Sequence, residues 1–177
     1  MPGGRKPQQR ELCGQPAPTG AAWLPLTRGL FALVDADLFE GLSRYSWQAR
    51  HSRGCWYASR DLMSRTRVHL HHVVMGTTPD EVHIDHINGN GLDNRRSNLR
   101  GATQRQNLQN AGRRVDNTSG FKGVYYSQAS KKWAAQIRYE GKQKYLGLFH
   151  DARDAAKAYN AAALKYFGAF ARLNEGV

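Results

Sequence analysis

The stretch Val82-His83-Ile84-Asp85-His86-Ile87-Asn88-Gly89-Asn90-Gly91 decides the local organisation of the chain. Its first four residues read as a β-strand, and its last four residues tolerate positive φ in turns. Residues 98–102 are typical of a returning strand. The sequence therefore predicts two strands joined by a long loop.

A helix is expected directly after the second strand. Thr103 and Gln106 have the spacing of a capping box, so the helix should begin there and carry Asn107 in its second turn. In this order of elements, Asp85 and His86 end a strand and Asn107 lies near the start of a helix. We expect these three side chains to face one another.

These residue types suit a phosphodiesterase site with one metal ion. Asp85 offers an anionic oxygen ligand and Asn107 a neutral carbonyl oxygen, which leaves Mg²⁺ or Mn²⁺ with positions for water and phosphate oxygens. Such an ion would neutralise charge on the scissile phosphate and on the leaving 3′ oxygen. His86, with an ordinary pKa of about 6.5, is the candidate catalytic base. Asn98 is predicted to hold the loop that orients His86.

The charge of the chain favours a polyanionic partner. There are 26 Lys and Arg and 14 Asp and Glu among 177 residues, a net charge of +12. Between Arg95 and Lys144, twelve Lys and Arg are accompanied only by Asp116 and Glu140. Most of the positive charge therefore lies in one stripe, which we expect to contact nucleic acid.

The remaining composition bounds the class of protein. Cys13 and Cys55 are isolated, which argues against a disulfide framework or a Cys-ligated zinc and favours a reducing cytosol. No apolar run approaches the roughly 20 residues of a membrane span. We therefore expect a cytoplasmic protein that contacts no membrane.

The region before the Asp-His pair is predicted to be a small α+β support. Residues 1–22, rich in Pro, Gly, Gln and Arg, are expected to form a flexible tail. Strand patterns follow at residues 30–34, 45–48 and 56–60, with a brief helix over residues 35–42. If residues 67–75 continue as a strand, His69 and His71 share one face and His72 lies on the other.

Several ordered motifs resemble the HNH homing endonucleases of phages and mobile introns: Leu70-His71-His72, residues 82–90, Leu92-Asp93-Asn94-Arg95, Ser97-Asn98-Leu99-Arg100, Gln106-Asn107 and Asn110. The resemblance covers residues 24–114 and implies a ββα-metal fold. It implies that Asp85 and Asn107 bind one divalent metal, that His86 is the general base and that Asn98 supports it. Asn107 stands where many members of that family carry His.

The histidines around this motif leave an alternative. Five of the seven histidines lie between His69 and His86, and a zinc site built from them is the competing interpretation. For His69, His72 and His83 we favour ordinary strand or surface positions. His71, in the Leu-His motif, is expected to pack near the site or to contact phosphate.

A second domain is predicted after a linker at residues 113–118. Three short strands are expected at residues 122–126, 132–139 and 144–149, with a hairpin turn between the last two. Small and aromatic residues at helical spacing predict a helix over residues 151–167, which Gly168 ends. The predicted fold class is α+β, with an HNH module at residues 23–112 and a three-stranded antiparallel sheet packed on one helix at residues 119–174.

This second domain resembles an AP2 DNA-binding domain through Ser119-Gly120-Phe121-Lys122-Gly123-Val124, residues 132–138, residues 145–149, residues 155–162 and residues 168–174. The resemblance implies that the sheet enters the major groove of double-stranded DNA. The residues expected to contact DNA are Lys122, Tyr125, Tyr126, Lys131, Lys132, Trp133, Gln136, Arg138, Lys142 and Lys144. One face of the sheet is expected to carry the basic residues of this set with Trp133 and either Tyr125 or Tyr126, and Gln136 is added by the resemblance. The competing interpretation places Trp133, Tyr145 and Phe149 in the core.

Together these patterns predict a metal-dependent, site-preferring DNA endonuclease, homing-endonuclease-like, of a bacterial or phage-infected host cell. It is expected to act by nicking and to need no obligate protein partner. The alternative is a DNA-binding regulator with an inactive HNH module.

Overall fold

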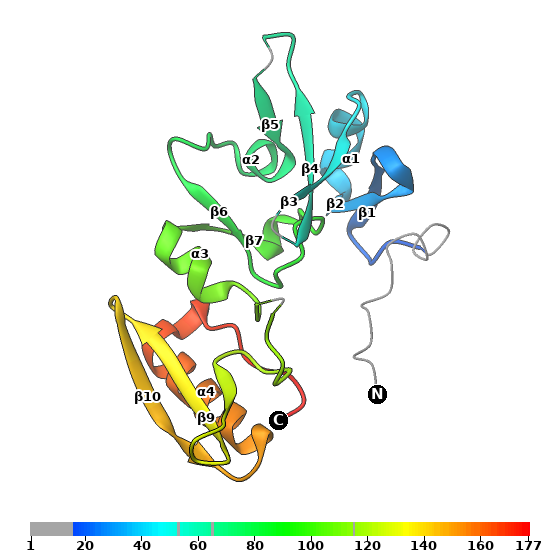
Figure 1. Ribbon diagram of the computed structural model, residues 1–177. Helices are drawn as coiled ribbons and strands as arrows, with labels where there is room; N and C mark the ends of the chain where they lie inside the picture. The colour runs from blue at the N-terminus through cyan, green and yellow to red at the C-terminus, as the bar shows by residue number, and fades with distance from the viewer. Residues whose placement is uncertain (1–15, 53, 65, 115) are drawn as a thin grey trace. The chain divides into compact units, whose positions relative to one another are not determined.

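The computed structural model describes residues 16–52, 54–64, 66–114 and 116–177 (Figure 1). Its residues divide into two compact units, one ending at Thr103 and one beginning at Gln104. Each unit has its own buried apolar core. No helix within these ranges is long and apolar enough to cross a membrane.

The first unit opens with a hairpin and a helix. β1 (Ala21–Pro25) pairs antiparallel with β2 (Phe31–Asp35) around the 3-10 turn η2 (Thr27–Gly29), and α1 (Ala36–Ser43) follows. Leu24, Val34, Leu42 and Trp47 join one buried apolar cluster. β1 begins inside the stretch predicted as a flexible tail, because Leu24 is part of this core; residues 1–15 lie outside the described residues.

A three-stranded antiparallel sheet carries the middle of the unit. β3 (Gln48–Ser52), β4 (Cys55–Asp61) and β5 (Arg67–His69) lie in the order β3-β4-β5, and α2 (Leu70–Met75) follows β5. The strand predicted over residues 45–48 begins only at Gln48. The strand considered for residues 67–75 ends at His69, so that prediction is wrong for the residues beyond it. These residues form α2, which buries the Leu70 side chain and ends at Gly76 with φ 63°.

The stretch that begins at Val82 has the predicted order. β6 (His83–His86), the 3-10 turn η3 (Arg96–Asn98) and β7 (Leu99–Ala102) follow one another, and β6 pairs antiparallel with β7. α3 (Gln104–Asn110) starts directly after Thr103, where the capping-box spacing predicted a helix. The strand, loop, strand and helix are therefore confirmed along the chain.

The second unit is a sheet covered on one side by a helix. β8 (Val124–Ser127), β9 (Lys132–Tyr139) and β10 (Lys142–Phe149) form an antiparallel sheet in the order β10-β9-β8. α4 (Ala152–Phe167) packs on it through Ala155, Ala156 and Tyr159, and η4 (Gly168–Phe170) follows. The turn between β9 and β10 is Glu140-Gly141, with φ 52° and 75°, as a two-residue hairpin requires.

α3 belongs to this second unit, earlier in the chain than the predicted linker at residues 113–118. It packs against η4, and the Arg105 guanidinium lies 5.4 Å from the centre of the Tyr139 ring. These contacts within the second unit place the division at Thr103 and Gln104.

Candidate functional site

The end of β6 buries two adjacent polar residues. Asp85 is 7% exposed and His86 6% exposed. The register of β6 and β7 places Asp85 opposite Arg100, which donates from Nε and Nη2 to Asp85 Oδ2 at 2.8 and 2.6 Å. This charge-assisted pair offsets the free-energy cost of burying the carboxylate.

The His86 ring lies among other rings. His71 of α2 and Tyr57 of β4 meet it in edge-on geometry, with ring centroids 5.2 and 6.0 Å away. Burial lowers the pKa of His86 below its ordinary value of 6.5, while the Asn94 side chain and nearby carboxylates oppose this shift. His86 is therefore mostly neutral at pH 7, and neutral imidazole is the form that accepts a proton.

The other histidines form a cluster with His71 at its centre. His71 stacks on His69 at 5.2 Å and lies 4.7 Å from His72, measured between ring centroids. Burial lowers the pKa of His71 to about 2. His72 Nδ1 is 3.0 Å from Thr77 Oγ1, and His83 is exposed. Within the described ranges, no group of three or more His, Cys, Asp or Glu side chains is placed to hold a metal ion.

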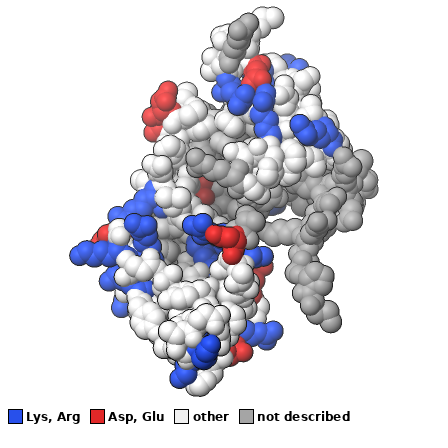
Figure 2. Space-filling view, in the orientation of Figure 1, with Lys and Arg blue, Asp and Glu red and all other residues white. Residues whose placement is uncertain are grey.

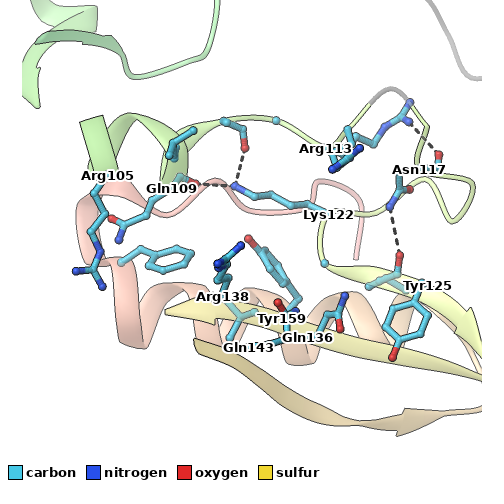
Figure 3. Close-up of a pocket in the computed structure, with 18 of the residues that line it drawn as sticks. Arg105, Gln109, Arg113, Asn117, Lys122, Tyr125, Gln136, Arg138, Gln143 and Tyr159 are labelled. Carbon is cyan, nitrogen blue, oxygen red and sulfur yellow. Dashed lines mark hydrogen bonds between the residues drawn. The ribbon is translucent and has the colours of Figure 1, made fainter. Parts of the chain in front are cut away.

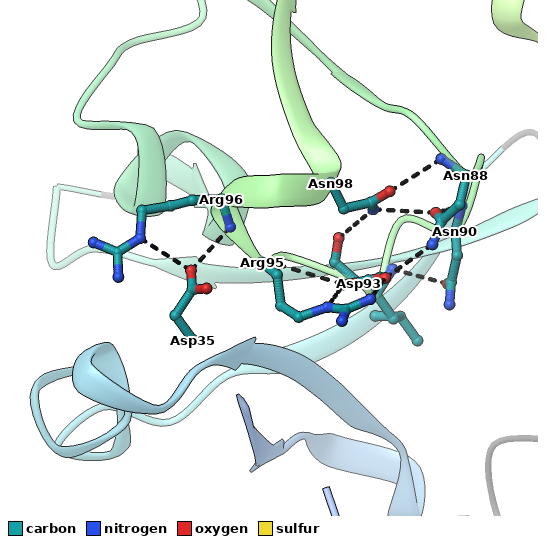
Figure 4. Close-up of polar contacts among 8 residues, drawn as sticks. Asp35, Asn88, Asn90, Asp93, Arg95, Arg96 and Asn98 are labelled. Carbon is teal, nitrogen blue, oxygen red and sulfur yellow. Dashed lines mark hydrogen bonds and ion pairs between the residues drawn. The ribbon is translucent and has the colours of Figure 1, made fainter. Parts of the chain in front are cut away.

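Asn98 cross-links the loop that follows His86 (Figure 4). Its Nδ2 donates to the Asp93 carbonyl at 2.8 Å and to Asn88 Oδ1 at 3.1 Å, and its Oδ1 accepts from the Asn88 backbone N–H at 3.0 Å. The Ile87 backbone N–H donates to the Asn98 carbonyl. The Asn98 side chain therefore joins both ends of this loop, and Asn98 holds Ile87 and Asn88, the residues that follow His86.

The far end of the loop is tied to the first hairpin. The Asn94 backbone N–H donates to the Leu33 carbonyl at 2.7 Å. Arg96 donates from its backbone and its side chain to Asp35 and from its side chain to Asp37. These links connect β2 and α1 with the loop, which explains why the region before the Asp-His pair is a support.

Three neighbours of the Asp-His pair were not found by sequence reasoning: Arg100, Tyr57 and Asn94. The pairing of Arg100 with Asp85 could have been predicted from the sequence with the register of the two strands, because that register fixes which residues lie opposite one another. Asn94 lies within the quoted motif, but its role beside His86 does not follow from spacing. Tyr57 is distant in sequence, and no local pattern connects it with the site.

Asn107, the other expected metal ligand, lies on α3 in the second unit. Its Oδ1 is buried and accepts no hydrogen bond within the part of the chain that the structure describes. An unsatisfied buried acceptor costs about 1 to 3 kcal/mol unless an ion or water binds it. The approach of Asn107 to Asp85 and His86 stays a prediction.

Strand register divides the expected DNA contacts of the second unit between two faces. The face opposite α4, called the open face from here on, alternates with the core positions of β9 and contains Tyr125, Ser127, Lys132, Ala134, Gln136, Arg138, Gln143, Tyr145 and Leu148. Of the ten expected contacts, it brings together Tyr125, Lys132, Gln136 and Arg138. Gln143 and Tyr145 lie on the same face but were not among the expected contacts, although two-residue alternation along β10 indicates them. The competing interpretation placed Tyr145 in the core, whereas its side chain is exposed.

Tyr126, Trp133, Lys142 and Lys144 lie on the helix-covered side. The prediction that one face carries Trp133 together with all the basic residues is therefore wrong, and contact of these four residues with DNA stays a prediction. Trp133 packs into the cluster under α4 and meets Tyr126 in edge-on geometry. Lys144 Nζ lies 5.3 Å from the centre of the Tyr166 ring of α4. Lys142 pairs with Tyr139, whose side chain stacks on Tyr166, and so shares that side. Lys131, with φ 55°, lies in the turn before β9.

The Lys122 ammonium binds the backbone at the end of α3 (Figure 3). Its Nζ donates to the backbone carbonyls of Gln109 and Ala111, both at 2.6 Å. Burial, with a smaller effect of Arg172, lowers the pKa of Lys122 to about 8. Lys122 therefore fixes the end of α3 within the second unit, and its contact with DNA stays a prediction.

The second unit retains a strong positive charge. From Gln104 onward there are thirteen Lys and Arg and five Asp and Glu, a net charge of +8. In Figure 2, Lys and Arg side chains gather beside the β9 and β10 hairpin. Tyr125 and Tyr145 are 42% and 58% exposed, so aromatic side chains accompany the cations on the open face.

Known proteins are similar to this chain over parts of different length. The HNH endonuclease family model matches residues 68–109. An uncharacterized HNH endonuclease of Acanthamoeba polyphaga mimivirus is 30% identical over 159 residues, which cover 84% of this chain and 76% of that protein. Protein 3.8 of Escherichia phage T7 is 35% identical over 79 residues, 45% of this chain and 65% of that protein. APETALA2-like protein 2 of Oryza sativa subsp. indica is 40% identical over 57 residues, 32% of this chain and 13% of that protein. No solved structure matches significantly.

The buried Asp-His pair, the cross-linked loop and these similarities define the class of protein as a nuclease. The chain belongs to the HNH endonuclease family.

Proposed function

We propose that the chain is a metal-dependent DNA endonuclease that cleaves near a preferred sequence. The observation that carries this proposal is the buried Asp85-His86 pair at the end of β6, beside a loop cross-linked by Asn98. The reaction is hydrolysis of a phosphodiester to a 5′-phosphate and a 3′-hydroxyl. A chain with one such site nicks one strand in each binding event.

The residues fit one divalent cation with oxygen ligands, Mg²⁺ or Mn²⁺. Asp85 offers a carboxylate. Asn107 offers a buried carbonyl oxygen that accepts no hydrogen bond from the described residues. When bound, such an ion neutralises charge on the scissile phosphate and on the leaving oxygen.

His86 is the general base of this proposal. Because its burial lowers its pKa, the ring is ready to accept a proton from the attacking water at neutral pH. The edge-on contacts with His71 and Tyr57 restrict the ring plane. Asn98 is a positioning residue, because it holds the backbone that follows His86.

DNA targeting is assigned to the open face of the second unit. Lys132 and Arg138 supply cations there, and Gln136 and Tyr125 supply polar and aromatic side chains. Cations that meet phosphates and a few side chains that meet bases are what groove recognition requires. The 57-residue similarity to APETALA2-like protein 2 supports an AP2-type domain.

The test is nicking of supercoiled plasmid with Mg²⁺ or Mn²⁺. We expect relaxed product from the wild type and a loss of about 10²- to 10⁴-fold in His86→Ala, with a comparable loss in Asp85→Ala. The matched control is His83→Ala, because His83 is exposed on the same strand. Equal product from all four proteins, or none from the wild type, favours the alternative of a DNA-binding regulator with an inactive HNH module.

A further inference from the structure

The second unit contains a pocket of about 820 Å³ between residues 105–114 and 116–117 on one side and the sheet on the other (Figure 3). Leu108, Tyr159 and Phe167 give it an apolar lining. Arg113 lines it from the loop after α3, and Arg138 lines it from β9. The pocket therefore combines apolar surface with guanidinium groups from two different elements.

Hydrogen bonds hold the loop side of this pocket in place. Lys122 Nζ holds the carbonyls of Gln109 and Ala111. The Lys122 backbone N–H donates to Asn174 Oδ1 at 2.7 Å, and Asn174 Nδ2 donates to the Lys122 carbonyl at 3.1 Å. Asn117 Nδ2 donates to the Phe121 carbonyl at 3.0 Å. A wall formed before binding loses less conformational entropy when a ligand arrives.

Three arginines of the pocket are not neutralised by carboxylates. Arg114, which also lines it, is paired with Asp116 at 3.0 Å. In contrast, none of the ion pairs among the described residues includes Arg105, Arg113 or Arg138. Arg105 lies over the Tyr139 ring, and Arg113 reaches the Asn117 carbonyl only at 3.5 Å. The guanidinium groups of these three arginines suit phosphate oxygens.

The pocket is continuous with the open face, because Tyr125, Gln136, Arg138 and Gln143 belong to both. We propose that the pocket binds the backbone of one DNA strand beside the sheet, with phosphates on Arg105, Arg113 and Arg138 and deoxyribose against the apolar lining. This inference rests on the proposed DNA-directed function. It adds the loop after α3 to the DNA contact, which would then extend beyond the sheet.

The test measures binding of the full chain to a labelled duplex over a salt series, without divalent metal. Arg113→Gln is expected to weaken binding roughly tenfold. Since each lost phosphate contact removes about 0.9 from the slope of log K against log salt, the slope should fall by about that amount. The matched control is Arg153→Gln, which removes the same charge from an exposed position of α4 outside the pocket. It should leave affinity and slope close to those of the wild type.

An unchanged slope in Arg113→Gln, or an equal change in Arg153→Gln, would overturn the pocket assignment. Inorganic phosphate at matched ionic strength should displace no more duplex than chloride does; stronger displacement would assign the pocket to a free anion instead. Plasmid nicking by the wild type is scored separately. Nicking with an unchanged slope rejects the pocket alone, and a changed slope without nicking rejects the nuclease alone.

Discussion

Arg100 and Asp85 lie directly opposite each other on β7 and β6, and two N–H groups of the guanidinium donate to the same carboxylate oxygen. The side chains of this pair are only 17% and 9% exposed. The guanidinium of Arg100 therefore compensates the negative charge of Asp85, the expected metal ligand.

Arg100→Gln should destabilise the first unit, because it removes the guanidinium beside a buried carboxylate. We expect a loss of about 1 to 3 kcal/mol in the free energy of unfolding, measured with urea. Arg67→Gln is the control, since the Arg67–Asp61 pair is 50% and 38% exposed, and should change stability by less than about 1 kcal/mol. If Asp85 binds Mg²⁺, added Mg²⁺ should stabilise Arg100→Gln more than the wild type.

His71 is expected to orient His86 through its ring and not through its charge. The His71 Nδ1 atom is buried, and it neither donates nor accepts a hydrogen bond within the described part of the chain. His71→Phe should therefore retain most of the nicking rate at saturating DNA. His71→Ala removes the edge-on contact and should lower the rate about 10- to 100-fold. Loss of activity in both variants alike would show that the imidazole itself is required.

Gly123 tolerates no larger residue. Its φ is 75°, and an added Cβ would overlap the Tyr159 ring and lie 2.6 Å from the Gln136 carbonyl oxygen. Gly123→Ala should therefore lower the stability of the second unit by about 2 kcal/mol or more in thermal unfolding. Gly120→Ala has a similar φ of 82° with open space around it, so a smaller loss of about 1 kcal/mol is expected there. Equal losses would mean that backbone strain alone acts at both positions.

Lys122 should make stability depend on alkaline pH. Burial holds its pKa at about 8 in the folded chain, below the ordinary 10.5, so the unfolded chain binds more protons between these values. Stability should therefore rise as pH increases from about 8 to about 10.5, by up to about 3 kcal/mol. The neutral amine still has two N–H groups for the two carbonyls it contacts. The measurement is urea unfolding of the wild type and Lys122→Met across this range; a constant difference between them would contradict the prediction.

The sequence by itself determined the local elements and the chemistry of the Asp-His stretch. Strand alternation, Asn-Gly turn residues and capping-box spacing depend on neighbours in the chain, so β6, β7, α3 and the hairpin of β9 and β10 could be predicted. α4 was predicted almost to its bounds, because its small residues repeat at helical spacing and Gly168 ends it.

Only the tertiary structure decided which side chains meet. Pairing register placed Arg100 on Asp85, and packing from α2 and β4 brought His71 and Tyr57 to His86. The register of β9 and β10 also places Trp133 and Lys144 on the helix-covered side of the sheet, although aromatic and basic side chains are typical of DNA contacts. Residue type and spacing indicate which chemical groups are present. Which side chains are buried, and which lie opposite one another on paired strands, depends on contacts between segments distant in sequence.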